Sequence, residues 1–369
     1  MNSIQEAGRL GHGIWLDYVQ RGMFRSGEFR KYLDLGITGV TSNPTIFEKA
    51  INESHDYDDD LLRFARAGRT TGEIYEALVL EDIGAAADML RPIYDSSKGE
   101  QGFVSLEVSP LLAFDTDKTV ADAKRLFALL HRPNILIKVP ATAEGIAAVR
   151  TLISEGVNVN ATLIFSLSYY KKVMESYLSG LEMRARNGGD LSNVASVASF
   201  FVSRIDTAVD ALLEEKIRSG QVQLKSLLGK AAVANAQLSY QEYRKIFQGE
   251  RFAALLKKKA RVQRPVWAST GTKNPAYSDV LYVEPLIGPE TVNTLPPGTI
   301  KAFLEHGQCK ANLCDTMPAA GETMKALAKA GIDMDAVTTK LLDDGVKSFS
   351  LSFEKLLKGI DNKKKQLLA

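Results

Sequence analysis

The chain has 369 residues, of which 45% are hydrophobic and 24% charged, as in globular proteins that bury a large core. Its 46 basic and 44 acidic residues give a formal charge of +2, which argues against a nucleic-acid-binding surface over the whole molecule. Two cysteines, Cys309 and Cys314, exclude a disulfide scaffold and lack the second pair of a zinc site, so we expect reduced thiols, no metal and a cytoplasmic protein. No apolar run approaches the ~18 residues of a membrane span, and the first residues lack the order of a signal peptide.

Short apolar runs rich in β-branched residues alternate with helical patterns along the chain, and such runs are typical of strands buried on both faces. The eight predicted strands are Ile14–Val19, Gly39–Asn43, Phe103–Val108, Ile135–Val139, Val157–Phe165, Val194–Val202, Val262–Ser269 and Val280–Val283. The predicted helices are Glu28–Leu35, Thr71–Leu90, Val120–Leu130, Ala143–Glu155, Leu167–Gly180, Ile205–Gly220, Ser226–Phe247 and Thr299–His306. Thr142 is the expected N-cap of the fourth helix.

Eight strands that alternate with helices indicate parallel βαβ units, and eight is the number that closes an α/β barrel of the (β/α)8 TIM type. An open doubly wound sheet is the alternative that strand counting leaves open. Two long segments between neighbouring strands, 45–102 and 203–261, are rich in helical patterns, and residues 299–369 are helical as well. We therefore expect one domain over residues 1–369, a barrel with additional helices in two insertions and a C-terminal tail.

Polar side chains interrupt these apolar strands at or near their C-terminal ends, where catalytic groups collect in a (β/α)8 barrel. They are Asp17, Asn43, Glu107, Lys138, Asn160, Thr162, Ser199 and Ser269. A single residue of this kind is explained by a hydrogen bond at the rim. So many of them on successive strands predict one shared pocket.

Lys138 is the most informative of these residues because it lies inside the apolar segment Ile135–Val139 and should be buried. Burial disfavours an ammonium group and favours the neutral amine that forms a Schiff base with a carbonyl substrate. The alternative is a structural lysine paired to Asp17 or Glu107, and the pattern leaves both readings open. The two carboxylates are accordingly either the groups that move protons in such chemistry or members of a buried ion-pair cluster.

A site for a small anion is predicted around Arg204 and the turn 269–274. Arg204 begins a helix after its strand, and the turn offers hydroxyls, backbone N–H groups and Lys273. Tight turns with these groups bind phosphate well. A solvated loop with an exposed lysine is the alternative.

Three segments resemble transaldolase: GVTSNPTIF at 39–47, ILIKVPAT at 135–142 and NATLIFS at 160–166. The resemblance runs from about residue 14 to 290 and is closest to the longer, bacterial-type branch. It implies a circularly permuted (β/α)8 barrel of the class I aldolase type, with a Schiff-base lysine on the fourth strand. It also implies transfer of a dihydroxyacetone unit between sugar phosphates in the pentose phosphate pathway, with no metal or organic cofactor and no nucleic-acid or membrane partner.

The resemblance implies a role for each polar residue. Lys138 would form the Schiff base, and Asp17 would take the proton from the hydroxyl beside the cleaved bond. Glu107 would move protons during carbinolamine dehydration through a water held near Thr162. The implied substrate ligands are Asn43, Asn160 and Ser199 for hydroxyls, and Arg204, Ser269 and Lys273 for the distant phosphate. The family often has an arginine shortly after the serine, and Lys273 stands here instead, so the phosphate-binding cation stays open.

The nearest alternative is a fructose-6-phosphate aldolase of the same superfamily, which releases free dihydroxyacetone. Those relatives are shorter and tend to carry a tyrosine near Phe201, a pocket position, and a glutamine near Glu107, so both residues and the length favour the transferase. A non-catalytic barrel that binds sugar phosphates is the other alternative, and a buried amine such as Lys138 argues against it. The sequence leaves open whether the chain is a monomer or a homodimer.

Overall fold

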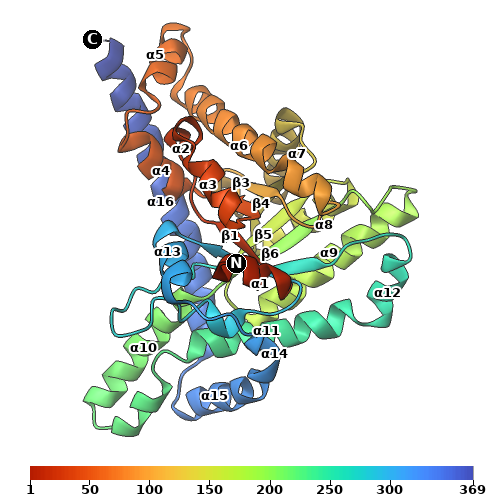
Figure 1. Cartoon of the computed structure of the whole chain (residues 1–369), viewed down its shortest axis with the longest axis vertical. Helices are drawn as coiled ribbons and strands as arrows, with labels where there is room; N and C mark the ends of the chain where they lie inside the picture. The colour runs from red at the N-terminus through yellow and green to blue at the C-terminus, as the bar shows by residue number, and fades with distance from the viewer. Residues whose placement is uncertain (369) are drawn as a thin grey trace.

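The computed structural model describes residues 1–368, apart from the side chain of residue 312. Eight parallel strands close into a barrel in the order in which they follow one another along the chain (Figure 1). They are β1 (His12–Leu16), β2 (Gly39–Thr41), β3 (Phe103–Glu107), β4 (Ile135–Pro140), β5 (Val159–Ile164), β6 (Ser196–Phe201), β7 (Gln263–Ala268) and β8 (Thr291–Leu295). The closed barrel confirms the predicted (β/α)8 fold and excludes the open sheet.

The prediction of the eighth strand is wrong. Residues Val280–Val283 lie in turns that lead into the short 3-10 helix η3 (Glu284–Leu286), and β8 follows it. This turn resembles a strand in its sequence because its apolar residues Val280 and Val283 pack in the hydrophobic core. β8 itself contains polar residues such as Asn293, whose side chain is fully buried and donates to the Tyr282 carbonyl at 3.0 Å. A prediction from apolar content therefore assigned a strand to a buried turn. It did not identify β8, because the polar groups of that strand are hydrogen-bonded inside the barrel.

Helices surround the barrel (Figure 1). Before β3 they are α1 (Ser3–Arg9), α2 (Arg21–Ser26), α3 (Glu28–Leu35), α4 (Pro44–Asn52), α5 (Asp58–Arg66) and α6 (Thr71–Ser96). Between β3 and β8 they are η1 (Pro110–Leu112), α7 (Thr116–Leu130), α8 (Ala143–Ser154), α9 (Leu167–Arg186), α10 (Ser203–Arg218), η2 (Val222–Leu227), α11 (Ala231–Phe247) and α12 (Glu250–Leu256). After β8 come α13 (Pro297–His306), α14 (Asn312–Asp315), α15 (Met317–Lys329) and α16 (Met334–Leu368).

Local chemistry sets the ends of these helices. The expected N-cap of α8 is confirmed, because the Thr142 hydroxyl accepts from the Gly145 N–H at 3.0 Å. The helix predicted over Ser226–Phe247 is in fact divided into η2 and α11. The division falls at Gly229, whose φ of +68° belongs to the left-handed region that glycine tolerates.

The C-terminal helix α16 crosses the molecule beside α4, α5 and α6 and also reaches β5 (Figure 1). Its buried apolar residues recur every three or four positions and so form one stripe along the helix. They are Leu342, Val346, Phe349, Phe353, Leu356 and Ile360. This stripe packs α16 against the helices that follow β2, and it brings Phe349 to the end of the barrel where the polar residues gather.

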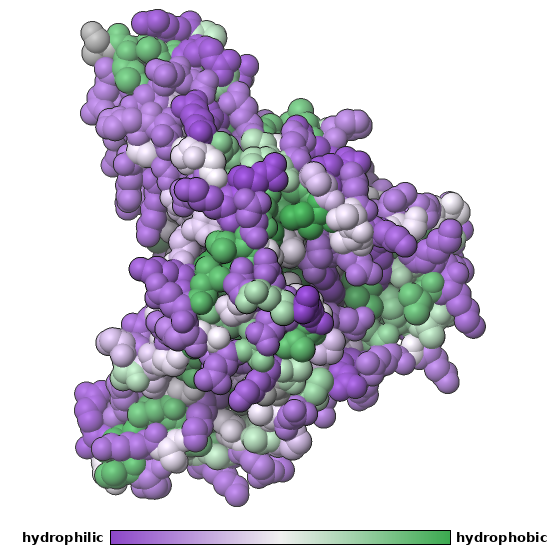
Figure 2. Space-filling model, in the orientation of Figure 1, coloured by the Kyte–Doolittle hydropathy of each residue, from purple (hydrophilic) through white to green (hydrophobic). Residues whose placement is uncertain are grey.

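The face of the molecule drawn in Figure 2 is mainly hydrophilic, with hydrophobic residues gathered in separate patches. Within residues 1–368, the helices all lack the apolar length that crossing a bilayer requires.

Candidate active site

The strand register brings three of the predicted residues together. Glu107 on β3 pairs with Lys138 on β4, and Lys138 pairs with Asn160 on β5. Residues in register on parallel strands point to the same face, so these three side chains enter the barrel side by side. All three are at least nine-tenths buried.

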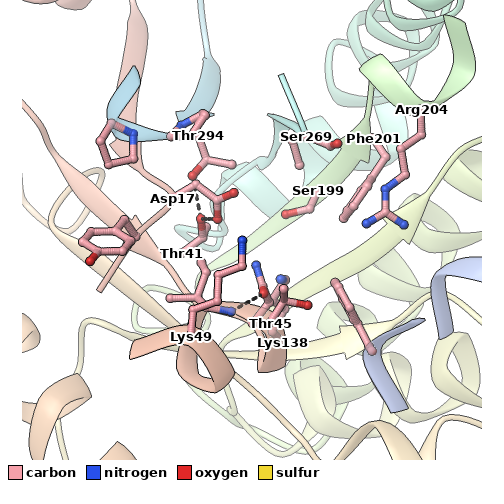
Figure 3. A pocket seen from close by; sticks show the side chains of 17 residues that line it. Asp17, Thr41, Thr45, Lys49, Lys138, Ser199, Phe201, Arg204, Ser269 and Thr294 are labelled. Carbon is pink, nitrogen blue, oxygen red and sulfur yellow. Dashed lines mark hydrogen bonds between the residues drawn. The ribbon is translucent and has the colours of Figure 1, made fainter. Parts of the chain in front are cut away.

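A cavity of about 370 Å³ lies at the C-terminal end of the strands (Figure 3). This volume is typical of a small-molecule site. Seven of the eleven predicted site residues line it: Asp17, Asn43, Lys138, Ser199, Phe201, Arg204 and Ser269. The other four, Glu107, Asn160, Thr162 and Lys273, lie around it without lining it.

The amine of Lys138 lies in the wall of this cavity. Its Nζ is 3.2 Å from Glu107 Oε2, donates to the Ser42 carbonyl at 3.1 Å, and lies 5.6 Å from the centre of the Phe349 ring. The ion pair that the sequence left open therefore exists. Lys138 nevertheless lines the cavity, so its amine lies within reach of a molecule that enters it.

Asp17 lies directly after β1, and its backbone N–H donates to the Leu295 carbonyl at 2.8 Å. Its Oδ1 accepts from the Thr41 hydroxyl at 2.8 Å, and Thr41 Oγ1 is itself 2.6 Å from Thr294 Oγ1. Burial raises the pKa of Asp17, while the Lys138 charge and the Thr41 hydrogen bond oppose the rise. The result is a positioned carboxylate that is a stronger base than an exposed aspartate.

Glu107 and Thr162 supply polar groups without a protein hydrogen bond. Burial raises the pKa of Glu107, with the Lys138 charge opposing the shift and Asp17 adding to it. Apart from the ion pair, no group within residues 1–368 donates a hydrogen bond to its carboxylate oxygens. The buried Thr162 hydroxyl also has no partner there. Buried polar atoms of this kind require water or substrate as a partner.

Two amide side chains, Asn160 and Asn43, contribute to the cavity in different ways. The Ser199 hydroxyl donates to Asn160 Oδ1 at 2.8 Å, and Asn160 Nδ2 donates to Ser105 Oγ at 3.0 Å. Ser199 lines the cavity, so Asn160 reaches it through Ser199. Asn43 caps α4 by accepting from the Ile46 N–H at 3.0 Å, and it lines the cavity as well.

The far end of the cavity is cationic. Arg204, in the first turn of α10, lies 5.5 Å from the centre of the Phe201 ring, and burial lowers its pKa. Within residues 1–368 no carboxylate pairs with it, so its charge is available to an anion. Lys273 does not line this cavity; it lines a neighbouring one of about 250 Å³, and both burial and the nearby Arg204 charge lower its pKa. Ser269 has a left-handed φ of +55°, and its hydroxyl lies 3.2 Å from Oγ of Ser203, which lines the neighbouring cavity.

Several residues of the cavity were not predicted from the sequence. Lys49 extends into it from α4 (Figure 3), and its signal was available, since Asn43 and Pro44 start a helix directly after a strand. Phe349 had no local signal, because α16 brings it from the far end of the chain. The remaining lining residues are Tyr18, Thr41, Thr45, Ile46, Ala268, Thr294, Pro296 and Pro297.

The described part of the chain, residues 1–368, holds no group of three His, Cys, Asp or Glu side chains placed as metal ligands would be. Cys309 and Cys314 are free thiols. The donors around the cavity are an amine, two carboxylates, hydroxyls and a guanidinium, which suit a polar organic anion.

Comparison with known proteins gives a consistent result over the whole chain. Residues 14–360 match the family described as Transaldolase/Fructose-6-phosphate aldolase. A protein of Thiobacillus denitrificans named transaldolase is 48% identical over 358 residues, which are 97% of this chain and 99% of that one. Proteins of the same name from Trichodesmium erythraeum and Saccharopolyspora erythraea are each 44% identical, over 99% and 97% of this chain and 98% and 97% of theirs.

Proposed function

Because this chain belongs to the transaldolase and fructose-6-phosphate aldolase family, we propose that its cavity transfers a dihydroxyacetone unit between sugar phosphates through a Schiff base on Lys138. Transaldolase activity is the function, and it belongs to the pentose phosphate pathway. The donors are sedoheptulose 7-phosphate or fructose 6-phosphate, and the acceptors are glyceraldehyde 3-phosphate or erythrose 4-phosphate. The observation that carries the proposal is a buried amine in the cavity wall, with one carboxylate paired to it and a second lining the same cavity.

The first step joins the substrate to the enzyme. Lys138 passes a proton to the neighbouring Glu107 carboxylate and, as the free amine, adds to the ketone carbon. A proton moves from nitrogen to the former carbonyl oxygen, which gives the carbinolamine. Glu107, through a water held by Thr162, then protonates the hydroxyl, and water leaves as the iminium forms. Burial raises the pKa of Glu107, which favours the protonated carboxyl that this step uses.

The second step breaks the carbon–carbon bond. Asp17 takes the proton from the hydroxyl next to that bond, and the iminium accepts the electron pair, so that an aldose phosphate leaves and an enamine stays on Lys138. The Thr41 hydrogen bond holds the Asp17 carboxylate in place for this transfer. Addition of the acceptor aldose runs the same sequence in reverse, and water releases the new ketose.

The remaining residues hold the substrate. Ser199, supported by Asn160, binds the first hydroxyl of the dihydroxyacetone unit, and Asn43 binds a further hydroxyl. Arg204 binds the phosphate together with Ser269, since no carboxylate competes for its charge. Lys273 adds positive charge from the neighbouring cavity. Phe201 forms the apolar side of the pocket beneath Arg204.

The experiment that tests this function separates transfer from release. The protein is incubated with fructose 6-phosphate, with and without erythrose 4-phosphate, and both sedoheptulose 7-phosphate and free dihydroxyacetone are measured. Transfer predicts that product ketose forms with the acceptor and that little free dihydroxyacetone appears without it. Release of dihydroxyacetone at the same rate in both cases would identify a fructose-6-phosphate aldolase instead.

We also propose that the chain, of which residue 369 lies outside the described residues, forms one barrel domain with helical insertions, and that the enzyme works in the cytoplasm. The closed barrel and the free thiols of Cys309 and Cys314 support these two statements.

A further inference from the structure

A second cavity, of about 270 Å³, lies on the other side of the Lys138–Glu107 pair. We call it the rear cavity, and it lies between α6, β3, α7 and α16. Among the residues that line it are Tyr75, Leu80, Glu107, Ser109, Asp122 and Phe353. Glu107 lines this cavity and not the substrate cavity, whereas Lys138 lines the substrate cavity and not this one. The ion pair therefore forms part of the wall between the two spaces.

Glu107 directs unpaired polar atoms toward the rear cavity. It is 6% exposed, and apart from the ion pair its carboxylate oxygens accept no hydrogen bond within residues 1–368. A buried carboxylate without donors is costly unless water reaches it. The cavity has room for several water molecules, since one needs only ~10–15 Å³ of such volume.

Polar groups continue from Glu107 to the protein surface. Ser109 and Asp122 line the rear cavity and are linked, because the Ser109 N–H donates to Asp122 Oδ2 at 3.4 Å. At the outer end, Arg125 donates to Asp122 at 2.7 Å and to Glu76 at 2.8 and 2.6 Å. Arg125 is exposed to solvent. The rear cavity thus joins a buried acid to bulk water without passing through the substrate cavity.

We infer that the rear cavity is the route by which water and protons move between Glu107 and solvent while a sugar phosphate fills the substrate cavity. The inference rests on the proposed function. Each Schiff base that forms breaks the bond between the ketone carbon and its oxygen and releases that oxygen as water, with a proton supplied by Glu107. The water must leave past Glu107, because the sugar itself fills the substrate cavity. Glu107 regains its proton from water along the same route when the iminium is hydrolysed.

The test measures exchange of the ketone oxygen of fructose 6-phosphate with water labelled with heavy oxygen. All variants carry Asp17→Asn, which removes the base for carbon–carbon cleavage. The intact sugar then stays in the substrate cavity, and the Schiff base only forms and reverses. Gly72→Trp places a large side chain at a lining position where an added Cβ meets no atom within 4 Å, and Leu80→Trp is a second blocking variant. Gly8→Trp is the matched control, because Gly8 is equally unobstructed and does not line the rear cavity.

Both blocking variants should slow oxygen exchange by roughly tenfold, while the control exchanges at the rate of its parent. Borohydride trapping of the sugar on Lys138 should be equal in the parent, the control and both blocking variants, since the substrate cavity is unchanged. Equal trapping with unchanged exchange in both blocking variants would overturn the rear route and leave the Schiff base standing. Absence of an adduct in the parent would instead reject the proposed function itself.

Discussion

Replacing Arg204 with alanine tests the phosphate end of the site. The guanidinium is partly buried beside Phe201 and has no carboxylate partner within residues 1–368, so the substrate phosphate is its expected counter-ion. A hydrogen bond to a charged group contributes about 1.5–3 kcal/mol. Loss of this contact should therefore lower kcat/KM for fructose 6-phosphate by roughly 10- to 150-fold. Most of the change should appear in KM, because the phosphate is distant from the reacting bond.

The same substitution should leave the stability of the free enzyme unchanged or raise it. Arg204 is partly buried without a carboxylate partner within residues 1–368, and this burial lowers its pKa, so removing its charge should not weaken the free enzyme. Inorganic phosphate should accordingly raise the Tm of the wild type and have no such effect on Arg204→Ala.

The assay compares fructose 6-phosphate with unphosphorylated fructose in the wild type, in Arg204→Ala and in the control Arg218→Ala. Arg218 belongs to the same helix, α10, at its exposed other end. The predicted loss is confined to the phosphorylated sugar and to Arg204→Ala. An equal loss on fructose would show that Arg204 acts on the sugar or on the fold, and would refute the assignment.

Three further substitutions test the proposed base, a buried histidine and the packing of α16. Asp17→Asn should lower kcat by roughly 10²- to 10⁴-fold with little change in KM, and a large rise in KM at normal kcat would argue against its role as the base. His12 is buried and its pKa lies at about 3 instead of 6.5, so the unfolded chain binds a proton that the folded one does not. The His12 contribution to stability should therefore fall as the pH drops below 6.5, by about 3 kcal/mol at pH 4.5, so the urea unfolding of His12→Gln should lose less stability over this range than the wild type does. Phe349→Ala should cost about 3–5 kcal/mol in the same measurement, and an unchanged midpoint would contradict the packing of α16 over the site.

The sequence predicted those parts of the site that depend on strand position. A charged residue inside an apolar strand of a barrel is expected to face its interior, so the positions of Lys138 and Glu107 could be predicted from the sequence. Register then decides which of them meet, and the Glu107–Lys138–Asn160 row follows from parallel pairing. The eighth strand was predicted wrongly because it is buried without being uniformly apolar: Asn293 is hydrogen-bonded inside the barrel.

What the sequence could not predict depends on distant packing. Phe349 reaches the site only because the apolar stripe on α16 packs beside α4 and α6. The sequence of α16 predicts an apolar face, but it does not predict which helices that face contacts. Lys273 was expected to share the substrate pocket, yet the turn after β7 directs it into the neighbouring cavity. The separation of Glu107 from the substrate cavity is likewise a property of how helices close over the barrel.

The most direct test of the central claim is to identify the lysine that carries the substrate. The wild type is incubated with fructose 6-phosphate and reduced with borohydride, and the modified peptide is mapped by mass spectrometry. Two lysines line the cavity, Lys138 and Lys49, and the second is an internal comparison. We expect a dihydroxyacetone adduct on Lys138 alone, and loss of both the adduct and all turnover in Lys138→Ala. An adduct on Lys49, or turnover that survives without Lys138, would contradict this claim.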